Sequence, residues 1–183
     1  MRIFTIGHST RSAAEFIAIL QAHGVQCIVD VRRYPGSKRH PQFSQEALRA
    51  LLTSHGIGYR HEPDLGGRRG NAAANSPNAA WRSASFRAYA DHMGTPEFAA
   101  AVERVLADAG RMSSALMCAE AVPWRCHRQL IADLLVAGGH DVLNLLSMDR
   151  ADPHRLNPAA RRAPDGTLTY PPAGGEQTGL FDG

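Results

Sequence analysis

The stretch "LMCAEAVPWRCHRQL", residues 116–130, brings several chemically versatile side chains close together along the chain. It contains two thiols, a carboxylate, an imidazole and a guanidinium. Groups of these types can transfer a proton, attack an electrophilic centre or hold an anion. The stretch is therefore the first candidate for an active site, and its chemistry comes from Cys118, Glu120, Cys126, His127 and Arg128.

Two carboxylates, Asp30 and Glu120, lie at or just after the ends of apolar, strand-like segments. An unpaired charge is costly at such a position because it is partly removed from water. Glu120 has no apparent partner nearby in the sequence, so we assign it as a general base or nucleophile. Asp30 is followed two residues later by Arg32. The two residues either form a structural ion pair or Asp30 orients catalytic groups, and the sequence leaves both interpretations open.

We expect a helix to begin at Pro123, where free amides and the helix dipole favour an anion. His127 should face the sheet from this helix. It is either a core histidine with satisfied hydrogen bonds or a partner of His8 in proton transfer. Cys126, near the same helix start and flanked by arginines, should have a lowered pKa and be a reactive thiol.

Zinc is an alternative role for Cys118, Cys126 and His127, together with His8. The spacing C-x7-C-H is not one of the usual zinc patterns, however, and the chain has no C-x-x-C pair. We therefore predict no metal site and no cofactor. A thiol or metal-binding protein stays open as an alternative.

A second segment, "RRYPGSKRH" at residues 32–40, has four Lys or Arg residues and no acid. Such a segment favours a phosphate group or a nucleic-acid backbone, although a solvated basic loop has the same composition. Residues 66–69 are expected to fold over the same place. The residues that we assign to anion or substrate binding are Ser9, Arg32, Ser37, Lys38, Gly67, Arg68 and Arg128.

The elements that position these residues follow from the apolar periodicity, which switches repeatedly between strand and helix. The alternation predicts an α/β domain, a Rossmann-like three-layer arrangement with a mainly parallel sheet. In such folds ligands bind beyond the carboxyl ends of the strands, so polar clusters after the first, second and fourth strands should share one edge. We predict strands at 2–6, 26–31, 57–61, 113–118 and 141–146, and helices after Ser12 and at 45–54, 83–92, 96–108 and 123–137.

Composition is typical of a globular domain, with 44% hydrophobic and 20% charged residues among 183. The net charge of +3 permits an anionic partner without indicating one. The N-terminus does not look like a secretory signal, and three cysteines do not make a disulfide framework, so we expect a cytoplasmic protein. We divide the chain into an α/β domain at 1–150 and a tail rich in Pro, Gly and Arg at 151–183.

Four blocks, "FTIGHST", "DVRRYPGSKRHPQFS", "DLGGRR" and "MCAEAVPWRCHR", resemble in order those of the domain-of-unknown-function family numbered 488. The resemblance covers roughly residues 2–150. It implies a small α/β domain and no established activity. The characteristic residues of the family lie, by this resemblance, at His8, Ser9, Asp30, Arg32, Ser37, Gly67, Arg68, Cys118, Glu120, Cys126, His127 and Arg128.

The end of the chain, "EQTGLFDG", fits the pattern Q-x-x-L-F at Gln177, Leu180 and Phe181. The pattern resembles the peptide by which bacterial replication and repair proteins dock on the sliding clamp. In such a peptide the glutamine makes hydrogen bonds while Leu and Phe enter an apolar groove. The alternative is that Leu180 and Phe181 pack on their own domain, because an exposed apolar pair needs some partner.

These features together favour an enzyme that acts on a phosphate-bearing substrate, a nucleotide or nucleic acid, in DNA maintenance. Hydrolysis at a phosphodiester centre and cleavage of a glycosidic bond fit equally well. The alternative is a non-catalytic accessory protein that binds nucleic acid or the sliding clamp.

Overall fold

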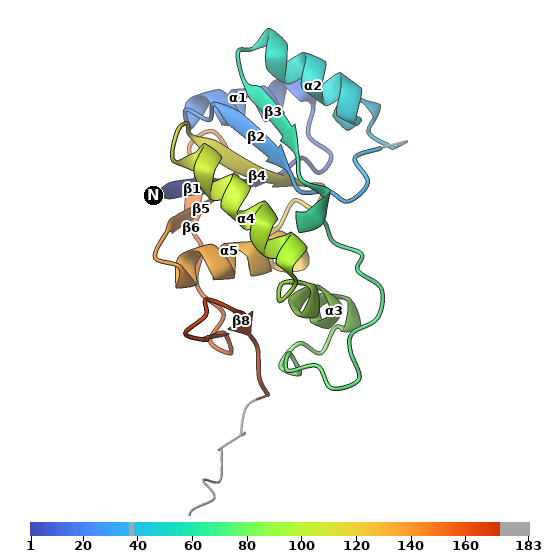
Figure 1. Cartoon of the computed structure of the whole chain (residues 1–183). Coiled ribbons are helices and arrows are strands. Elements are labelled where there is room, and N and C mark those ends of the chain that lie inside the picture. The colour runs from blue at the N-terminus through green and yellow to red at the C-terminus, as the bar shows by residue number, and fades with distance from the viewer. Residues whose placement is uncertain (37–38, 173–183) are drawn as a thin grey trace, which may run out of the picture.

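A computed structural model of the chain describes residues 1–36 and 39–172, and its centre is one six-stranded sheet (Figure 1). The strand order is β3-β2-β4-β1-β5-β6, and every neighbouring pair is parallel except β5 with β6. This confirms the predicted α/β fold with a mainly parallel sheet. The strands are β1 (Arg2–Gly7), β2 (Cys27–Asp30), β3 (Gly58–His61), β4 (Ser114–Cys118), β5 (Asp141–Leu145) and β6 (Ala151–Pro153).

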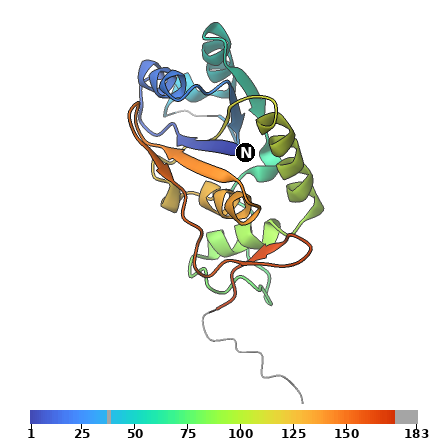
Figure 2. The same cartoon turned by 90° about the vertical axis from the view of Figure 1, so that its left-hand side faces the viewer.

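Helices cover both faces of the sheet, so that the strands are buried from two sides (Figures 1 and 2). Alternate residues of one strand enter different cores: Ile28 of β2 packs with α1 and α2, and Val29 packs with α4 and α5. Burial on two faces explains why the strands are continuous apolar runs. The helices are α1 (Ala13–Ala22), α2 (Gln45–Ser54), α3 (Ala84–His92), α4 (Pro96–Ala109) and α5 (Arg128–Ala137).

Local capping explains where two of these helices start. Ser12 caps α1, and its hydroxyl accepts from the Glu15 amide while the Glu15 carboxylate accepts from the Ser12 amide. This is the capping box that the sequence predicts. Thr95 caps α4 in the same way by accepting from the Phe98 amide, with Pro96 as the first helical residue. Both predicted helix starts are confirmed.

The prediction that a helix begins at Pro123 is wrong for the first turn of that helix. Pro123–Arg125 forms a short 3₁₀ turn, η3, and Cys126 is extended with φ −126° and ψ 143°. The α-helix α5 begins only at Arg128. Proline at the first position suits a 3₁₀ turn as well as an α-helix, and here Cys126 leaves the helical path and is buried. The amides of residues 124–128 therefore do not form a single helix N-terminus.

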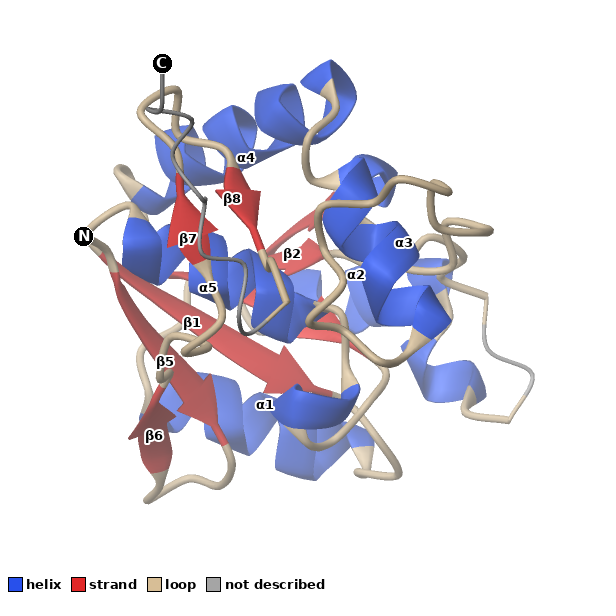
Figure 3. Cartoon of the chain, turned by 90° about the horizontal axis from the view of Figure 1, so that it is seen from below, coloured by secondary structure: helices blue, strands red, loops and turns tan. Residues whose placement is uncertain are grey.

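The chain beyond residue 150 is built onto the domain as far as residue 172. After β6, the strands β7 (Arg161–Arg162) and β8 (Leu168–Thr169) form a hairpin beside α5 (Figure 3). The Tyr170 ring is fully buried, and its hydroxyl donates to Asp133 of α5 over 2.9 Å. The predicted site residues Ser37, Lys38, Gln177, Leu180 and Phe181 lie outside the described residues. Within the part of the chain that the structure describes, no helix combines the length and apolar character needed to cross a membrane.

Candidate functional site

The carboxyl ends of β1, β2 and β4 lie side by side, and the predicted site residues His8, Ser9, Asp30, Arg32 and Glu120 follow or end these strands. Gly7 pairs with Cys118, and Asp30 pairs with Met117. The pairing continues past the strands, because the Ser9 amide donates to the Ala119 carbonyl over 2.8 Å. The three polar clusters therefore share one edge of the sheet, as the parallel topology predicts.

One group at this edge is a buried ion pair, which we call the ion-pair cluster: Asp30, Arg32, His8 and Tyr59. The Arg32 guanidinium donates from Nε to Asp30 Oδ1 over 2.8 Å and from Nη2 to Oδ2 over 2.6 Å. The Tyr59 hydroxyl donates to the same Oδ2 over 2.8 Å. Asp30 is fully buried and Arg32 is 6% exposed. Both charges are thus paired within a bidentate contact.

His8 completes this cluster and is fixed in one tautomer. Its Nε2 lies 3.3 Å from Arg32 Nη1, and a guanidinium only donates, so Nε2 accepts. Nδ1 then carries the proton and donates to the Ser9 carbonyl over 3.0 Å. The ring stacks on Phe43 at 4.3 Å. Burial lowers the pKa of His8 from 6.5 to about 4, so the ring is neutral at neutral pH and both its nitrogens are occupied.

A second group, which we call the thiol cluster, consists of Cys118, Cys126 and His127. Nε2 of His127 lies 3.0 Å from the carbonyl of Val31, which can only accept, so Nε2 carries the proton. Nδ1 then faces the two sulfur atoms, 3.9 Å from Cys118 Sγ and 3.7 Å from Cys126 Sγ, and it carries a lone pair when the ring is neutral. The three atoms lie within 4.8 Å of one another.

The two thiols of this cluster differ in acidity in the direction opposite to our expectation for Cys126. A hydrogen bond donated by Cys126 lowers the pKa of Cys118 well below its usual value, despite burial, and His127 and the Glu120 amide add to the effect. The same hydrogen bond, together with burial, raises the pKa of Cys126. Cys126 precedes α5 and is only 2% exposed, so the helix start does not make it the acidic thiol.

Arg128, the first residue of α5, connects the ends of β1 and β4 through hydrogen bonds to their backbone carbonyls. Its side chain is buried, and Nη1 donates to the carbonyls of Ile6 over 3.1 Å and Glu120 over 2.8 Å, while Nη2 donates to Ala121 over 3.0 Å. The remaining guanidinium nitrogen of Arg128, Nε, has no hydrogen-bond partner among the described residues. We predicted that Arg128 holds an anion, but its terminal donors satisfy backbone carbonyls at the ends of β1 and β4. Gly7 allows this approach, since an added Cβ would lie 1.8 Å from the Glu120 oxygen.

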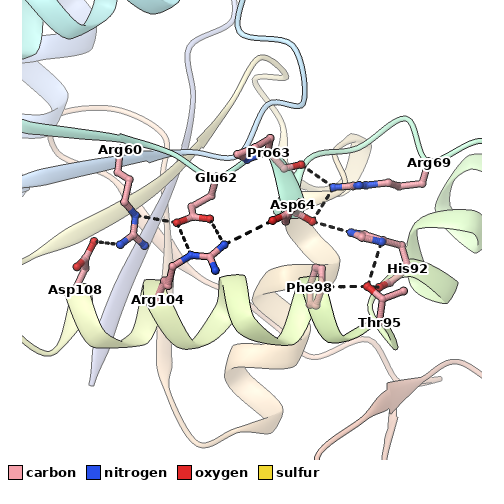
Figure 4. Close-up of polar contacts among 10 residues, drawn as sticks. All are labelled: Arg60, Glu62, Pro63, Asp64, Arg69, His92, Thr95, Phe98, Arg104 and Asp108. Atoms are coloured by element: carbon pink, nitrogen blue, oxygen red, sulfur yellow. Dashed lines mark hydrogen bonds and ion pairs between the residues drawn. The ribbon is translucent and has the colours of Figure 1, made fainter.

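The segment around Gly67 is bound to α3 and α4 through the residues on either side of it, Glu62 to Asp64 and Arg69 (Figure 4). Arg104 of α4 donates to Glu62 over 2.8 Å, and His92 of α3 donates to the Asp64 carbonyl over 2.7 Å. Arg69 adds a bond of 2.6 Å to the Pro63 carbonyl. Gly67 consequently packs on the His127 ring, where an added Cβ would lie 2.9 Å from Nδ1.

The exposed groups of this edge are a carboxylate, cations and an aromatic ring. Glu120 and Arg68 are exposed, and Arg33 donates to the Arg68 carbonyl over 2.8 Å and lies over the exposed Tyr34 ring at 5.7 Å. Among the described residues, the non-glycine positions with positive φ are Ser9 at 48° and Arg68 at 60°. Both were predicted site residues, and both belong to this edge.

Two exposed aromatic residues escaped the sequence analysis as site candidates. Trp124 in η3 is 64% exposed and lines a hollow of about 250 Å³ with Asn144 and His154. Tyr34 is also 64% exposed. Their position in the sequence could have identified them as candidates, because each lies in a segment with arginines that follows a predicted buried strand.

Comparison with known proteins gives a family and no characterised relative. The model of the family described as "Domain of unknown function DUF488" matches residues 12–135. No curated protein and no solved structure matches the chain. The matched segment runs from the start of α1 into α5 and includes both Asp30 and the thiol cluster.

Proposed function

We propose that this chain, which belongs to the DUF488 family, is an enzyme that acts on a phosphate-bearing substrate at the carboxyl edge of β1, β2 and β4. The observation that carries the proposal is the meeting of three strand ends with an exposed carboxylate, Glu120, and an exposed cation, Arg68. Parallel sheets bind ligands at this position. The substrate class that fits is a nucleotide or a nucleic acid.

Backbone strain supports the choice of this edge. A non-glycine residue whose backbone has a positive φ is strained by of order 1–3 kcal/mol. Such strain persists where the surrounding structure requires it, often at functional sites. Ser9 and Arg68 both have this conformation, and they come from different loops. Arg68 lies on an exposed loop whose backbone carbonyl accepts from the Arg33 guanidinium.

The roles we assign follow from exposure and partners. Glu120, exposed to solvent, acts as the general base that takes a proton from attacking water or as the nucleophile itself. Arg68 and Arg33 hold the phosphate, and the Tyr34 ring offers a stacking surface for a base. The buried ion-pair cluster positions the strand ends beneath them. Attack at a phosphodiester or at a glycosidic carbon both use this arrangement.

Substitution of Glu120 tests catalysis. Wild-type protein is incubated with a panel of nucleotides and oligonucleotides, and products are quantified chromatographically. Glu120→Gln should reduce turnover by at least about 100-fold, the usual lower range for loss of a general base, with binding unchanged. Glu46→Gln, which removes an equally exposed carboxylate from α2, should retain full turnover. Equal turnover in all three proteins would contradict the role of Glu120, and binding without turnover would favour the non-catalytic accessory.

Substitution of Arg68 tests the anion contact separately. Arg68→Ala should weaken binding to a fluorescent oligonucleotide and reduce the slope of log affinity against log salt by about one. Arg111→Ala is the matched control, because Arg111 is exposed just before β4, at the opposite edge of the sheet. Equal affinity of the wild type and both variants would remove phosphate recognition from this loop.

We further propose, from the sequence Q-x-x-L-F at 177–181, that the bacterial sliding clamp is a partner in DNA maintenance. Deletion of residues 176–183 should abolish binding to immobilised clamp, measured by surface plasmon resonance. The double substitution Leu180→Ala and Phe181→Ala should have the same effect. An intact chain that does not bind at high concentration would refute this partnership without affecting the proposed catalysis.

A further inference from the structure

We infer that Cys118, Cys126 and His127 form a binding site for one zinc ion or a similar soft divalent cation. The inference is independent of the proposed reaction, because it rests on the thiol cluster rather than on the exposed groups of the edge. The three residues come from the end of β4 and the turn before α5, and the fold brings their ligand atoms within 4.8 Å of one another.

The spacing of the atoms agrees with a tetrahedral ion. Zinc binds sulfur at about 2.3 Å and imidazole nitrogen at about 2.0–2.1 Å, which places neighbouring ligand atoms roughly 3.5–3.8 Å apart. The distances from His127 Nδ1 to Cys118 Sγ and Cys126 Sγ are 3.9 Å and 3.7 Å. Shifts of a few tenths of an ångström are therefore enough to close both sulfur–nitrogen edges around an ion.

The orientation of His127 is a second, independent observation that points to a cation. A metal-binding histidine almost always donates its other ring nitrogen to a carboxylate, a carbonyl or water, which fixes the ring and its tautomer. His127 donates from Nε2 to the Val31 carbonyl over 3.0 Å. In the neutral ring, the form that binds a metal ion, this leaves the Nδ1 lone pair aimed at two sulfur atoms. Tyr89, whose ring lies 4.9 Å from His127, and Gly67 hold the imidazole from the sides.

Charge and burial suit a divalent cation bound by two thiolates. Cys118 is 6% exposed and Cys126 is 2% exposed, so two ionised thiols without a counter-charge would be costly there. A divalent cation balances two thiolates, and the site as a whole becomes neutral. Three protein ligands leave one position of a tetrahedral ion for water or a substrate atom, as in catalytic zinc sites.

The sequence spacing concealed this site because Cys126 is not helical. Cys118 ends a strand, and residues between it and Cys126 form a loop and η3. The extended conformation of Cys126 then turns its sulfur back toward Cys118. A C-x7-C-H pattern is unusual for zinc because most compact sites take two ligands from one tight turn.

Metal content tests the inference without an activity assay. The full chain is purified in reductant, stripped with a chelator, dialysed against excess zinc and then against metal-free buffer, and analysed for zinc per chain. We expect one equivalent in the wild type and in Cys27→Ser. Cys27 is the matched control, because it is a buried free cysteine at the other end of the sheet, where it pairs with Ser114. Cys118→Ser, Cys126→Ser and His127→Gln should each lower affinity at least about tenfold.

Cobalt substitution of the wild type gives a second measurement that needs no variant. Two thiolate ligands should produce a strong sulfur-to-cobalt charge-transfer absorption, which saturates at one equivalent and disappears when zinc is added. Wild-type protein that takes up neither ion under reducing conditions would overturn the inference, as would equal uptake by Cys118→Ser. A loss of two hydrogen atoms by mass without reductant, together with no metal uptake, would assign the two thiols to a disulfide instead.

Discussion

The ion-pair cluster and the thiol cluster lie at the same edge of one sheet, yet their polar atoms face different surroundings. In the ion-pair cluster, both Asp30 oxygens accept from Arg32, and His8 occupies a further Arg32 donor. In the thiol cluster, Nδ1 of His127 and two sulfur atoms face mainly one another at 3.7–3.9 Å. A buried polar group whose hydrogen bonds are all made stabilises the fold, whereas possible ligand atoms that converge on one point remain able to bind a metal ion.

The largest effect that follows from this contrast is on stability. Asp30→Ala leaves the Arg32 guanidinium buried without its carboxylate, and removal of one partner of a buried ion pair costs about 3–5 kcal/mol. Urea denaturation should show this loss. Asp152→Ala breaks the exposed ion pair with Arg150 and should cost at most about 1 kcal/mol. Similar losses in both variants would mean that the ion-pair cluster is not a structural centre.

A pH titration sharpens the same comparison at His8. Burial lowers the pKa of His8 from 6.5 to about 4, so the unfolded chain binds the proton first as pH falls. The contribution of His8 is therefore complete above pH 6.5 and is lost between pH 6.5 and about 4, by at most about 3 kcal/mol.

Denaturation of the wild type and His8→Gln across this range isolates the histidine from titrating carboxylates. The stability difference between the two proteins should shrink as the pH is lowered. A difference that is constant with pH would show that the folded and unfolded chains bind the His8 proton equally, so that burial does not lower its pKa, and His8 would then be available for proton transfer near neutral pH.

The space beside His127 provides a smaller test, directed at the thiol cluster. In Gly67→Ala the new methyl group would lie 2.9 Å from Nδ1 of His127, and such crowding typically costs about 1–3 kcal/mol. The displaced ring should also weaken zinc binding in the assay described above. Gly36→Ala is the control, because no described residue lies within 4 Å of a Cβ added there. Equal stability and zinc affinity in both variants would show that Gly67 does not fix the ring.

The fold was largely predictable because each element carries its own signal. The leucine stripe of α2 and the Thr95–Pro96 start of α4 are local features, and the structure has these helices where the sequence predicts them. The first turn of α5 was not predictable in this way. Burial of Cys126 in the core, which is a tertiary effect, decides that the chain leaves the helical path after Arg125.

The meeting of the predicted site residues at one edge of the sheet was predictable, but the directions of their side chains were not. Parallel strands bring their carboxyl ends to one edge, so the meeting of Asp30, His8 and Cys118 follows from topology alone. That Arg128 turns inward depends on the carbonyl of Ile6, which is 122 residues away in the chain. Contacts of this range depend on how backbone groups are satisfied in three dimensions, which a local pattern does not record.

The smallest predicted effect concerns Tyr59, which is the member of the ion-pair cluster that lies on β3. Tyr59→Phe removes one hydrogen bond to Asp30 Oδ2 and leaves the bidentate contact with Arg32 in place. The loss of a single hydrogen bond to a charged group should cost about 1.5 kcal/mol by urea denaturation, at most about half of the Asp30→Ala effect. Tyr34→Phe, at an exposed ring, should cost nothing measurable. If Tyr59→Phe matched Asp30→Ala in its cost, the tyrosine would be essential to the ion pair, and the cluster would depend on β3 as much as on β2.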